Sequence, residues 1–342
     1  MQQRIKPCIS IILPVHNAGN YLKQCLDTLI HQTLKGIEII CIVDTPTDGS
    51  DLVVNEFRDR DNRIKVINNK ENLNIAESRN CGLRIATGEY IGFSDHDDWR
   101  ELNMYEQLYK KAKKESADIV ISNSYLVRKD IKEIHEFNDI TRDGIIGSLI
   151  LPMWSRFNPN FMSKSVWSSI YRRDLISSNK IYFPDKRVFY EEDTLFNLQA
   201  FLHASRIIYL DEPYYYWIKH ENSTSDKPVL NSVERQINYY GFIKNELSAN
   251  NVLSEFRLEF SILISSFIYI YLESYNQLSD KENLKLSEFR SYLKKNCIDN
   301  YTENHYNKKR LFQFSKLKYK LYLIHTTSVW NKSLKLLFKK NV

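Results

Sequence analysis

The sequence lacks the cysteine pattern of a disulfide-stabilised secreted protein or of a zinc protein. Its five cysteines are an odd number without paired spacing, and four of them lie inside apolar runs. This favours buried thiols in a reducing compartment. The first residues, M-Q-Q-R-I-K-P-C, show no signal-peptide pattern and lead straight into an apolar run. We therefore expect a cytoplasmic protein.

The sequence also lacks a hydrophobic run long enough to span a bilayer. The longest apolar stretch, residues 260–272, is well short of the roughly 20 residues that a spanning helix needs. Because Arg257, Glu259 and Glu273 flank it, we expect this stretch to form a core helix.

Two glycine-rich nucleotide-binding motifs are missing as well. Neither G-x-G-x-x-G nor G-x-x-x-x-G-K-[S/T] occurs, which argues against a dinucleotide-binding fold and against a P-loop protein. A nucleotidyltransferase would need a basic, glycine-rich phosphate loop after the first strand, and P-V-H-N-A-G-N at 14–20 is not such a loop.

Acidic residues are absent from the end of the chain. Residues 307–342 carry ten Lys and Arg but no Asp or Glu, so a basic tail follows a mildly acidic body. Its mixture of lysines with aromatic and aliphatic residues suits an amphipathic helix at an anionic membrane surface. The alternative is a terminal helix packed on the body with its lysines in water. We do not expect a nucleic acid partner, because no reading module accompanies the basic residues.

What is present, from residue 9 to about 125, is an alternation of apolar runs with segments of helical spacing. Strands are expected at I-S-I-I-L-P-V (9–15), I-E-I-I-C-I-V (37–43), R-I-K-V-I-N (63–68) and E-Y-I-G-F-S (89–94). Helices are expected at about 50–60, 74–86 and 101–115. This order predicts an α/β fold with an open, mostly parallel sheet and helices on both faces. After Ser225 the pattern turns helical, beginning with V-E-R-Q-I-N-Y-Y-G-F-I-K-N-E-L at 233–247.

Polar side chains follow all four predicted strands, at the ends where open parallel sheets bind ligands. The strand ends are Pro14-Val15-His16-Asn17, Asp44, Asn68-Asn69-Lys70 and Asp95-His96-Asp97-Asp98. The three carboxylates at 95–98 repel one another, and a hard cation such as Mg²⁺ or Mn²⁺ would relieve this repulsion. A solvated acidic turn is the alternative, but it does not explain polar groups at four successive strand ends. The sequence therefore predicts a binding crevice at this edge.

Seven motifs, in order, resemble those of the family 2 inverting glycosyltransferases of the GT-A fold, bacterial polysaccharide type. They are P-V-H-N (14–17), V-D-T-P-T-D-G-S (43–50), N-K-E-N-L-N-I-A-E-S-R-N (69–80), G-E-Y-I-G-F-S-D-H-D-D-W (88–99), K-S-V-W-S-S-I-Y-R-R-D-L-I (164–176), F-Y-E-E-D-T-L-F (189–196) and H-E-N-S-T-S (220–225). The resemblance implies a GT-A glycosyltransferase domain at 1–225, with a nucleotide-sugar half at about 1–125 and an acceptor half at about 126–225. A helical region with the basic tail, 226–342, would follow.

The resemblance also implies roles for individual residues. The nucleotide-sugar site would comprise Pro14, His16, Asn17, Asp44, Asn74, Arg79, Asp95 and His96. Within it Asp44 would reach the uracil ring, Arg79 the diphosphate and Asp95 the ribose. Asp97 would ligate Mn²⁺ or Mg²⁺, with Asp95 as a further ligand. His220 could approach the metal or the diphosphate, and the alternative is an exposed loop histidine without a role in the site. Two departures concern the base: His16 stands where tyrosine is usual, and the turn after Asp44 reads T-P-T-D instead of D-G-S-x-D.

The acidic pair in Y-E-E-D-T-L-F would supply the catalytic base, Asp193 first and Glu192 next. A carboxylate within hydrogen-bond reach is the expected base for an acceptor hydroxyl. Simple charge stabilisation at the start of a helix is the alternative for both residues. Trp99 and Trp167 could form walls of the sugar and acceptor sites, or they could belong to the core.

These residues and the resemblance together predict an inverting, metal-dependent glycosyltransferase. It would move a hexose or N-acetylhexosamine from a UDP-sugar to a hydroxyl of a glycan or lipid-linked glycan in surface polysaccharide biosynthesis. The enzyme would work in the cytoplasm, at the inner face of the membrane if residues 307–342 bind there. The alternative is a sugar-nucleotide-binding protein without turnover, which would not need Glu192 and Asp193.

Overall fold

The computed structural model describes residues 6–128, 131–135, 146, 149–150, 165–189, 191–220 and 233–256. The chain divides into two compact units, one formed by Met1–Leu149 with Trp154–Val229 and the other by Ile150–Met153 with Leu230–Val342. In the second unit, α8 (Val233–Ala249) is the helix that the sequence predicts from residue 233 onward. The expected boundary near 225, the expected helix at 260–272 and the basic tail lie outside the described residues.

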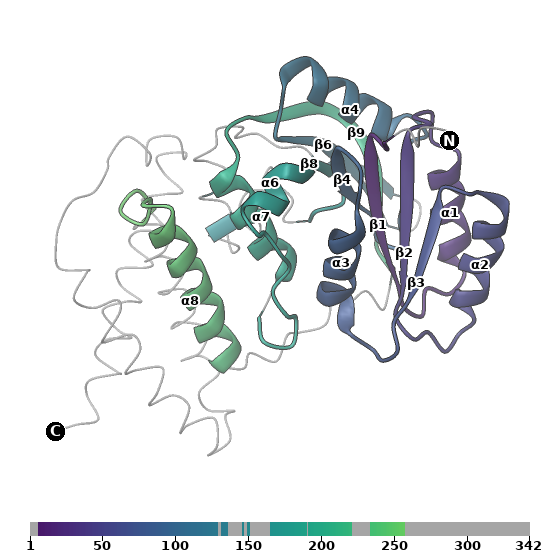
Figure 1. Cartoon of the computed structure of the whole chain (residues 1–342), viewed down its shortest axis with the longest axis horizontal. Coiled ribbons are helices and arrows are strands. Elements are labelled where there is room, and N and C mark those ends of the chain that lie inside the picture. Colours follow the sequence, from purple (N-terminus) through teal and green to yellow (C-terminus); the bar gives the residue numbers. More distant parts are fainter. Residues whose placement is uncertain are drawn as a thin grey trace. The chain divides into compact units, whose positions relative to one another are not determined.

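Four strands of the first unit form the parallel part of a sheet (Figure 1). They are β1 (Ile9–Val15), β2 (Ile37–Val43), β3 (Ile64–Asn68) and β4 (Tyr90–Phe93), in the order β3-β2-β1-β4. All three pairings are parallel. Every residue of β1 and β2 is buried, as expected for strands covered on both faces. The open α/β sheet predicted from the apolar runs is therefore confirmed.

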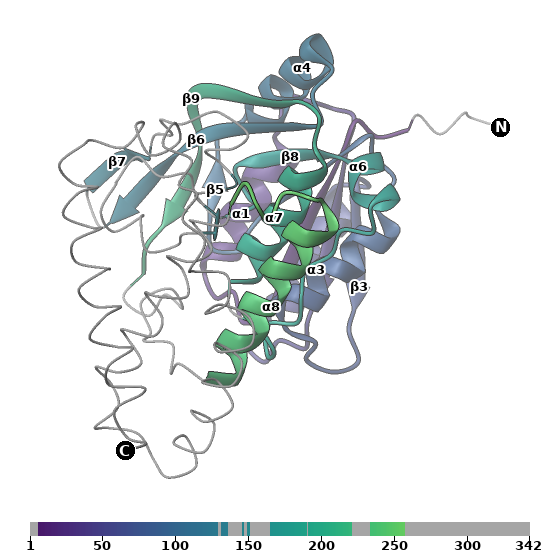
Figure 2. The ribbon, with the colours of Figure 1, turned by 90° about the vertical axis from the view of Figure 1, so that its left-hand side faces the viewer.

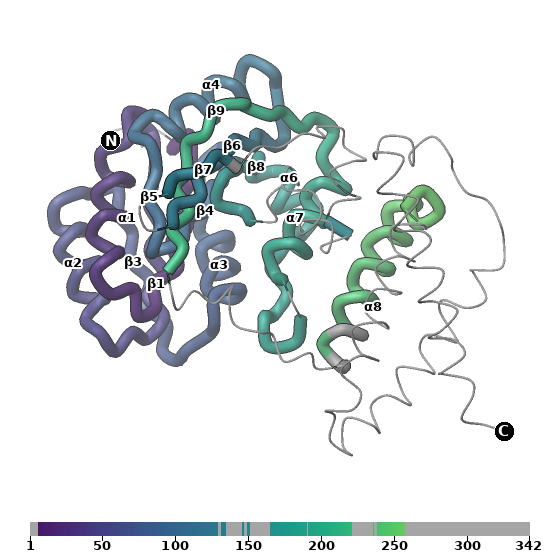
Figure 3. Tube along the Cα trace, turned by 180° about the vertical axis from the view of Figure 1, so that it is seen from behind, coloured from purple at the N-terminus to yellow at the C-terminus, as the bar shows by residue number. Residues whose placement is uncertain are grey.

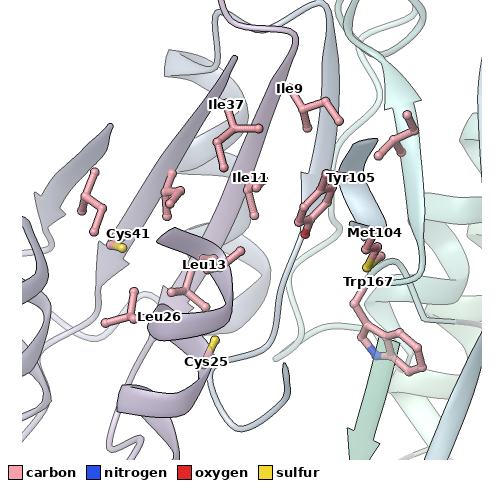
Figure 4. Close-up of a cluster of buried hydrophobic side chains, with 14 of the residues drawn as sticks. Ile9, Ile11, Leu13, Cys25, Leu26, Ile37, Cys41, Met104, Tyr105 and Trp167 are labelled. Atoms are coloured by element: carbon pink, nitrogen blue, oxygen red, sulfur yellow. The ribbon is translucent and has the colours of Figure 1, made fainter. Parts of the chain in front are cut away.

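Helices cover both faces of this sheet. On one face, α1 (Tyr21–Ile30), α2 (Ser50–Arg60) and α4 (Met104–Glu115) contribute to a core with β1 and β2. Figure 4 shows Ile11 and Leu13 of β1 in this core, with Leu26 and Cys25 of α1. On the other face lies α3 (Asn74–Ile85), as Figure 1 shows. A Cβ at Gly82 would collide with the Ile12 side chain, so this glycine permits the close approach of α3 to β1.

Beyond β4 the sheet is mixed, because it contains antiparallel as well as parallel pairings. Next to β4 follow β8 (Ser169–Arg172), β6 (Ile119–Arg128), β9 (Ile207–Ile218) and β5 (Trp99–Arg100), while β7 (Ile131–His135) pairs with β6. Figures 2 and 3 show β6 and β9 side by side, and their pairing is parallel. The antiparallel pairing of β5 with β9 brings the end of β9 back to the segment that follows β4.

A second apolar cluster fixes α7 (Glu192–His203) close to β4; α6 (Arg173–Ser178) precedes it in the chain. The ring of Phe93 in β4 lies 5.4 Å from that of Phe196 in α7 and 5.1 Å from that of Phe183, both edge to face. The rings of Phe183 and Phe196 stack at 4.1 Å. The first turn of α7 is thereby positioned near residues 95–98. In the described part of the chain, no helix is both long and apolar enough to cross a membrane.

Candidate active site

Polar groups after β1, β2, β3 and β4 meet at one edge of the sheet. Nδ1 of His16 lies 2.6 Å from the backbone oxygen of Asp44, and Nδ2 of Asn69 donates to the Asp44 carboxylate at 2.7 Å. Nδ1 of His96 lies 3.3 Å from the backbone oxygen of Pro14. These contacts connect the ends of all four parallel strands. The structure thus brings together the residues that the sequence places at successive strand ends.

Asp44 is buried and holds the turn that precedes α3. Its Oδ1 accepts hydrogen bonds from Asn69 Nδ2 at 2.7 Å and from the Leu73 amide at 2.9 Å. Its Oδ2 accepts one from the amide of Asn74 at 3.1 Å, and the residue is 3% exposed. Asn74 has a φ of +68°, in the left-handed region, which these bonds help to maintain. The carboxylate that the resemblance assigns to the uracil ring is therefore engaged by the protein itself.

Exposed side chains at this edge are His16, Asn17 and Asn72. Nδ2 of Asn17 lies 3.4 Å from Nε2 of His16, and Nδ2 of Asn72 lies within 3.5 Å of both nitrogens of the same ring. The sequence analysis did not single out Asn72. Its place in the motif at 69–80, directly after a predicted strand, is the signal that could have identified it.

The segment 95–98 contains two kinds of carboxylate. Asp98 is 2% exposed and accepts hydrogen bonds from the Tyr215 hydroxyl at 2.9 Å and the Ile218 amide at 2.8 Å. Burial, together with the charges of Asp97 and Asp95, raises the pKa of the Asp98 carboxyl well above its usual range. The side chains of Asp95 and Asp97 are 26% and 38% exposed. Asp98 thus fixes the segment to β9, while Asp95 and Asp97 are accessible to a ligand.

Asp97 has the surroundings of a cation ligand. Burial, and then the charge of Asp95, raises the pKa of Asp97, and a divalent cation would relieve this repulsion. His220 Nε2 lies 3.9 Å from Asp97 Oδ2, and its ring packs on that of Tyr21 at 4.0 Å between centroids. Within the described ranges, no three His, Cys, Asp or Glu side chains are gathered to hold an ion by themselves. One or two carboxylates completed by phosphate and water suit Mg²⁺ and similar ions, so the donor set fits a cation that shares its ligands with a substrate.

Tyr215 anchors this segment to the core. Its hydroxyl accepts a hydrogen bond from the Asp95 amide at 3.2 Å and donates to Asp98. Its ring stacks on Trp167 at 4.3 Å, and Trp167 is 5% exposed, so this tryptophan belongs to the core. Sequence reasoning missed Tyr215, because it lies 120 residues from Asp95 and only the pairing of β5 with β9 brings it there.

A buried guanidinium links the segment 95–98 to the first turn of α7. Arg79 of α3 is 1% exposed and donates to Asp95 Oδ1 at 2.9 Å and to Asp193 Oδ1 at 2.5 Å. Glu192 Oε1 lies 3.8 Å from Nη1 of Arg79, the atom that donates to Asp193. The guanidinium also lies over the ring of Phe183 at 5.2 Å. Four candidate residues, from three separate segments, are therefore in one charge cluster.

Asp193 is a carboxyl of this cluster whose pKa lies near neutrality. Burial raises the pKa of Asp193 to about 7; the charges of Glu192 and Asp95 act in the same direction, whereas Arg79 and Lys186 lower it. Its side chain is 23% exposed, compared with 9% for Glu192, which lies 3.5 Å from Lys186 Nζ. A partly accessible carboxyl that titrates near pH 7 is suited to accept a proton from a substrate.

Comparison with known proteins gives a consistent result. Residues 10–178 match the profile of glycosyl transferase family 2. The chain is 31% identical to the uncharacterized glycosyltransferase EpsJ of Bacillus subtilis, over 68% of this chain and 67% of that protein. It is 32% identical to the cholesterol galactosyltransferase of Borreliella burgdorferi, over 80% of this chain and 78% of that protein. The structure of S. aureus TarS 1–349 in complex with UDP-GlcNAc aligns with a TM-score of 0.62 and 22% identity, over 81% of this chain and 78% of that chain. This likeness confirms the expected GT-A-like fold.

Proposed function

The chain belongs to glycosyltransferase family 2, and we propose that it is an inverting, metal-dependent enzyme acting on a UDP-sugar. It would move a hexose or N-acetylhexosamine to a hydroxyl of a glycan or glycolipid in surface polysaccharide biosynthesis. The UDP-GlcNAc in the TarS complex supports the choice of a UDP-sugar donor. The cholesterol galactosyltransferase among its relatives supports a hydroxyl acceptor.

The observation that carries this proposal is the charge cluster around Arg79. Inverting transfer requires a base near the donor, because the acceptor hydroxyl must lose a proton as it attacks the anomeric carbon from the face opposite the leaving group. Asp95 follows β4, where the donor is expected, and Asp193 opens α7. Arg79 contacts both, and this supports a carboxyl with a pKa of about 7 beside the expected donor position.

In this proposal Asp193 takes the proton while the acceptor oxygen forms its bond to the anomeric carbon. The bond from that carbon to the diphosphate breaks, and UDP leaves with the electron pair. Asp97 would hold a Mn²⁺ or Mg²⁺ ion, with Asp95 and His220 as further ligands. When bound, the ion supplies positive charge that stabilises the departing diphosphate. Arg79 orients Asp193, and Glu192 is the second choice for the base.

The remaining residues of the proposed nucleotide-sugar site are Pro14, His16, Asn17, Asp44, Asn74 and His96. We propose that they surround the base and ribose, since they lie at the ends of β1, β2 and β4 and at the start of α3.

We also propose a cytoplasmic enzyme with its catalytic domain at 1–225, held at the inner membrane face by residues 307–342. Truncation before residue 307 should then weaken binding to anionic vesicles, and unchanged binding would contradict a membrane role for the tail.

The first test is calorimetric titration of the protein with UDP in Mn²⁺ and again after EDTA. We expect micromolar binding in Mn²⁺ that is lost in EDTA, because phosphate oxygens complete the ligand set of the ion. A screen of UDP-sugars would follow, with UDP release as the readout. Absence of UDP binding in both conditions would contradict the proposal. UDP-sugar binding without turnover on any acceptor would favour a binding protein instead.

A further inference from the structure

The imidazole of His16 has a tautomer that the backbone defines. Its Nδ1 lies 2.6 Å from the carbonyl oxygen of Asp44. A carbonyl oxygen can only accept a hydrogen bond, so Nδ1 must carry the proton. In the neutral ring Nε2 is then an acceptor with its lone pair directed away from Asp44. The exposed face of His16 therefore offers an acceptor to a ligand.

Two amides beside this ring are also oriented by the backbone. Asn17 Oδ1 accepts a hydrogen bond from the Thr47 amide at 2.8 Å, and Asn72 Oδ1 accepts one from the Asn74 amide at 3.1 Å. Since a backbone N–H cannot donate to an NH₂ group, these bonds assign the oxygen of each amide. Both NH₂ groups consequently lie toward His16, at 3.4 Å and 3.5 Å from Nε2. The result is an acceptor accompanied by two donors.

The acceptor on His16 is also available. Its two amide neighbours lie beyond the usual N–H···N or N–H···O hydrogen-bond distance, so a ligand N–H can take the Nε2 lone pair without breaking a strong bond. Asp44, by contrast, is buried and already accepts three hydrogen bonds from the protein. We therefore expect the exposed side chains at this edge, His16, Asn17 and Asn72, to contact the base.

We propose that His16 is the residue that selects the nucleotide base, with Nε2 accepting a hydrogen bond from N3–H of uracil. The proposal rests on the proposed UDP-sugar donor and names the contact by which the protein would distinguish uracil from cytosine. Uracil presents N3–H between two carbonyl oxygens, which is the complement of an acceptor accompanied by two donors. The NH₂ groups of Asn17 and Asn72 supply those donors. Cytosine has an acceptor at N3, and two lone pairs would face each other.

The experiment compares three nucleotides and four proteins by calorimetry in Mn²⁺. The nucleotides are UDP, N3-methyl-UDP, in which a methyl group replaces the imide proton, and CDP. For the wild type we expect UDP to bind about tenfold more tightly than either of the others, the effect of losing one hydrogen bond and leaving a polar partner unpaired. His16→Phe keeps a flat ring but has no acceptor. It should weaken UDP binding and reduce its preference over N3-methyl-UDP to about threefold or less.

Two further variants separate the contacts. Asn72→Ala should weaken UDP and N3-methyl-UDP equally, because it removes a donor to a carbonyl oxygen that both carry. His31→Phe changes an exposed histidine at the end of α1, away from the four strand ends, and should leave all three affinities unchanged. Because His16, His31 and Asn72 are exposed, we expect these variants to fold, and their melting temperatures would verify this.

The outcomes are distinct. If the wild type binds no UDP, the proposed function fails and this inference fails with it. If UDP binds but His16→Phe retains the full preference over N3-methyl-UDP, the proposed function stands and the role of His16 is wrong. The imide would then be read by another group, with Asp44 as the next choice.

Discussion

Two regions of the same sheet edge differ in their accessible groups: one presents uncharged amides and an imidazole, and the other a cluster of charged side chains. The base region, defined as His16, Asn17, Asp44 and Asn72, exposes an imidazole and two amides while its one carboxylate is buried and satisfied. The transfer region, defined as Arg79, Asp95, Asp97, Glu192 and Asp193, gathers three carboxylates around one buried guanidinium, with the fourth, Asp97, close enough to Asp95 for their charges to repel. A neutral hydrogen-bonding surface suits recognition of an uncharged base, whereas the chemistry requires groups that move protons and hold cations. In the proposed function, the two tasks would lie at different strand ends.

The largest expected effect is on the transfer region. Asp193→Asn preserves the size of the side chain but removes its ability to accept a proton, so the transfer rate should fall by about 10²- to 10⁴-fold. UDP affinity should stay close to that of the wild type, because the base region is untouched. Initial rates of UDP release and calorimetric titration measure the two quantities. Glu191→Gln is the control. Glu191 is the neighbouring acidic residue, and its carboxylate accepts a hydrogen bond from the Thr194 hydroxyl. A near-normal rate for Asp193→Asn would transfer the role of base to Glu192.

The second largest effect is expected on the free energy of unfolding. Arg79→Ala leaves Asp193 and Asp95 without their shared cation, and removing one member of a buried ion pair costs about 3–5 kcal/mol of unfolding free energy. Arg84→Ala on the same helix removes an exposed partner of Glu77, and should cost about 1 kcal/mol or less. Urea unfolding of both variants makes the comparison. Equal losses would mean that the buried cluster does not depend on its guanidinium.

The parallel strands and the polar strand ends could be predicted from the sequence because both are local signals. The near-continuous apolar run at 9–15 is typical of a buried strand or of part of a buried helix, and the polar residues that follow are adjacent in the chain. The contacts of Tyr215 could not be predicted in this way, because they depend on the register of β9 against β5. The burial of Asp44 could not be predicted either, because its hydrogen-bond donors come from the turn before α3. Sequence spacing does not distinguish a carboxylate that the protein already binds from one that is available to a ligand.

A smaller effect is expected for Asp97→Ala. If Asp97 holds the ion, this variant should weaken UDP binding in Mn²⁺ by about 10- to 100-fold, a loss comparable to that seen when metal sites are perturbed. In EDTA neither protein holds the ion, so the variant and the wild type should show the same loss of UDP binding. The readout is the difference between the two titrations. Asp98→Asn is not a matched control, since Asp98 accepts hydrogen bonds from Tyr215 and Ile218 in the core. Asp51→Asn, at the first turn of α2, is suitable. Equal Mn²⁺ dependence in Asp97→Ala and the wild type would contradict the metal assignment.

For a change of one pH unit the smallest effect is the response of the wild type to pH, and it tests the same comparison without a mutation. A base must be deprotonated to work, and the pKa of Asp193 is raised to about 7. The rate at low acceptor concentration should therefore rise about tenfold per pH unit below 7 and level off above it. UDP affinity in Mn²⁺ should follow a separate curve, set by Asp97, whose pKa is raised by burial and by the charge of Asp95. Glu191→Gln should keep the midpoint of the wild type. A rate that is already constant from pH 5 upward would require a base with an ordinary carboxyl pKa, and the buried cluster around Arg79 would then serve only to position α7.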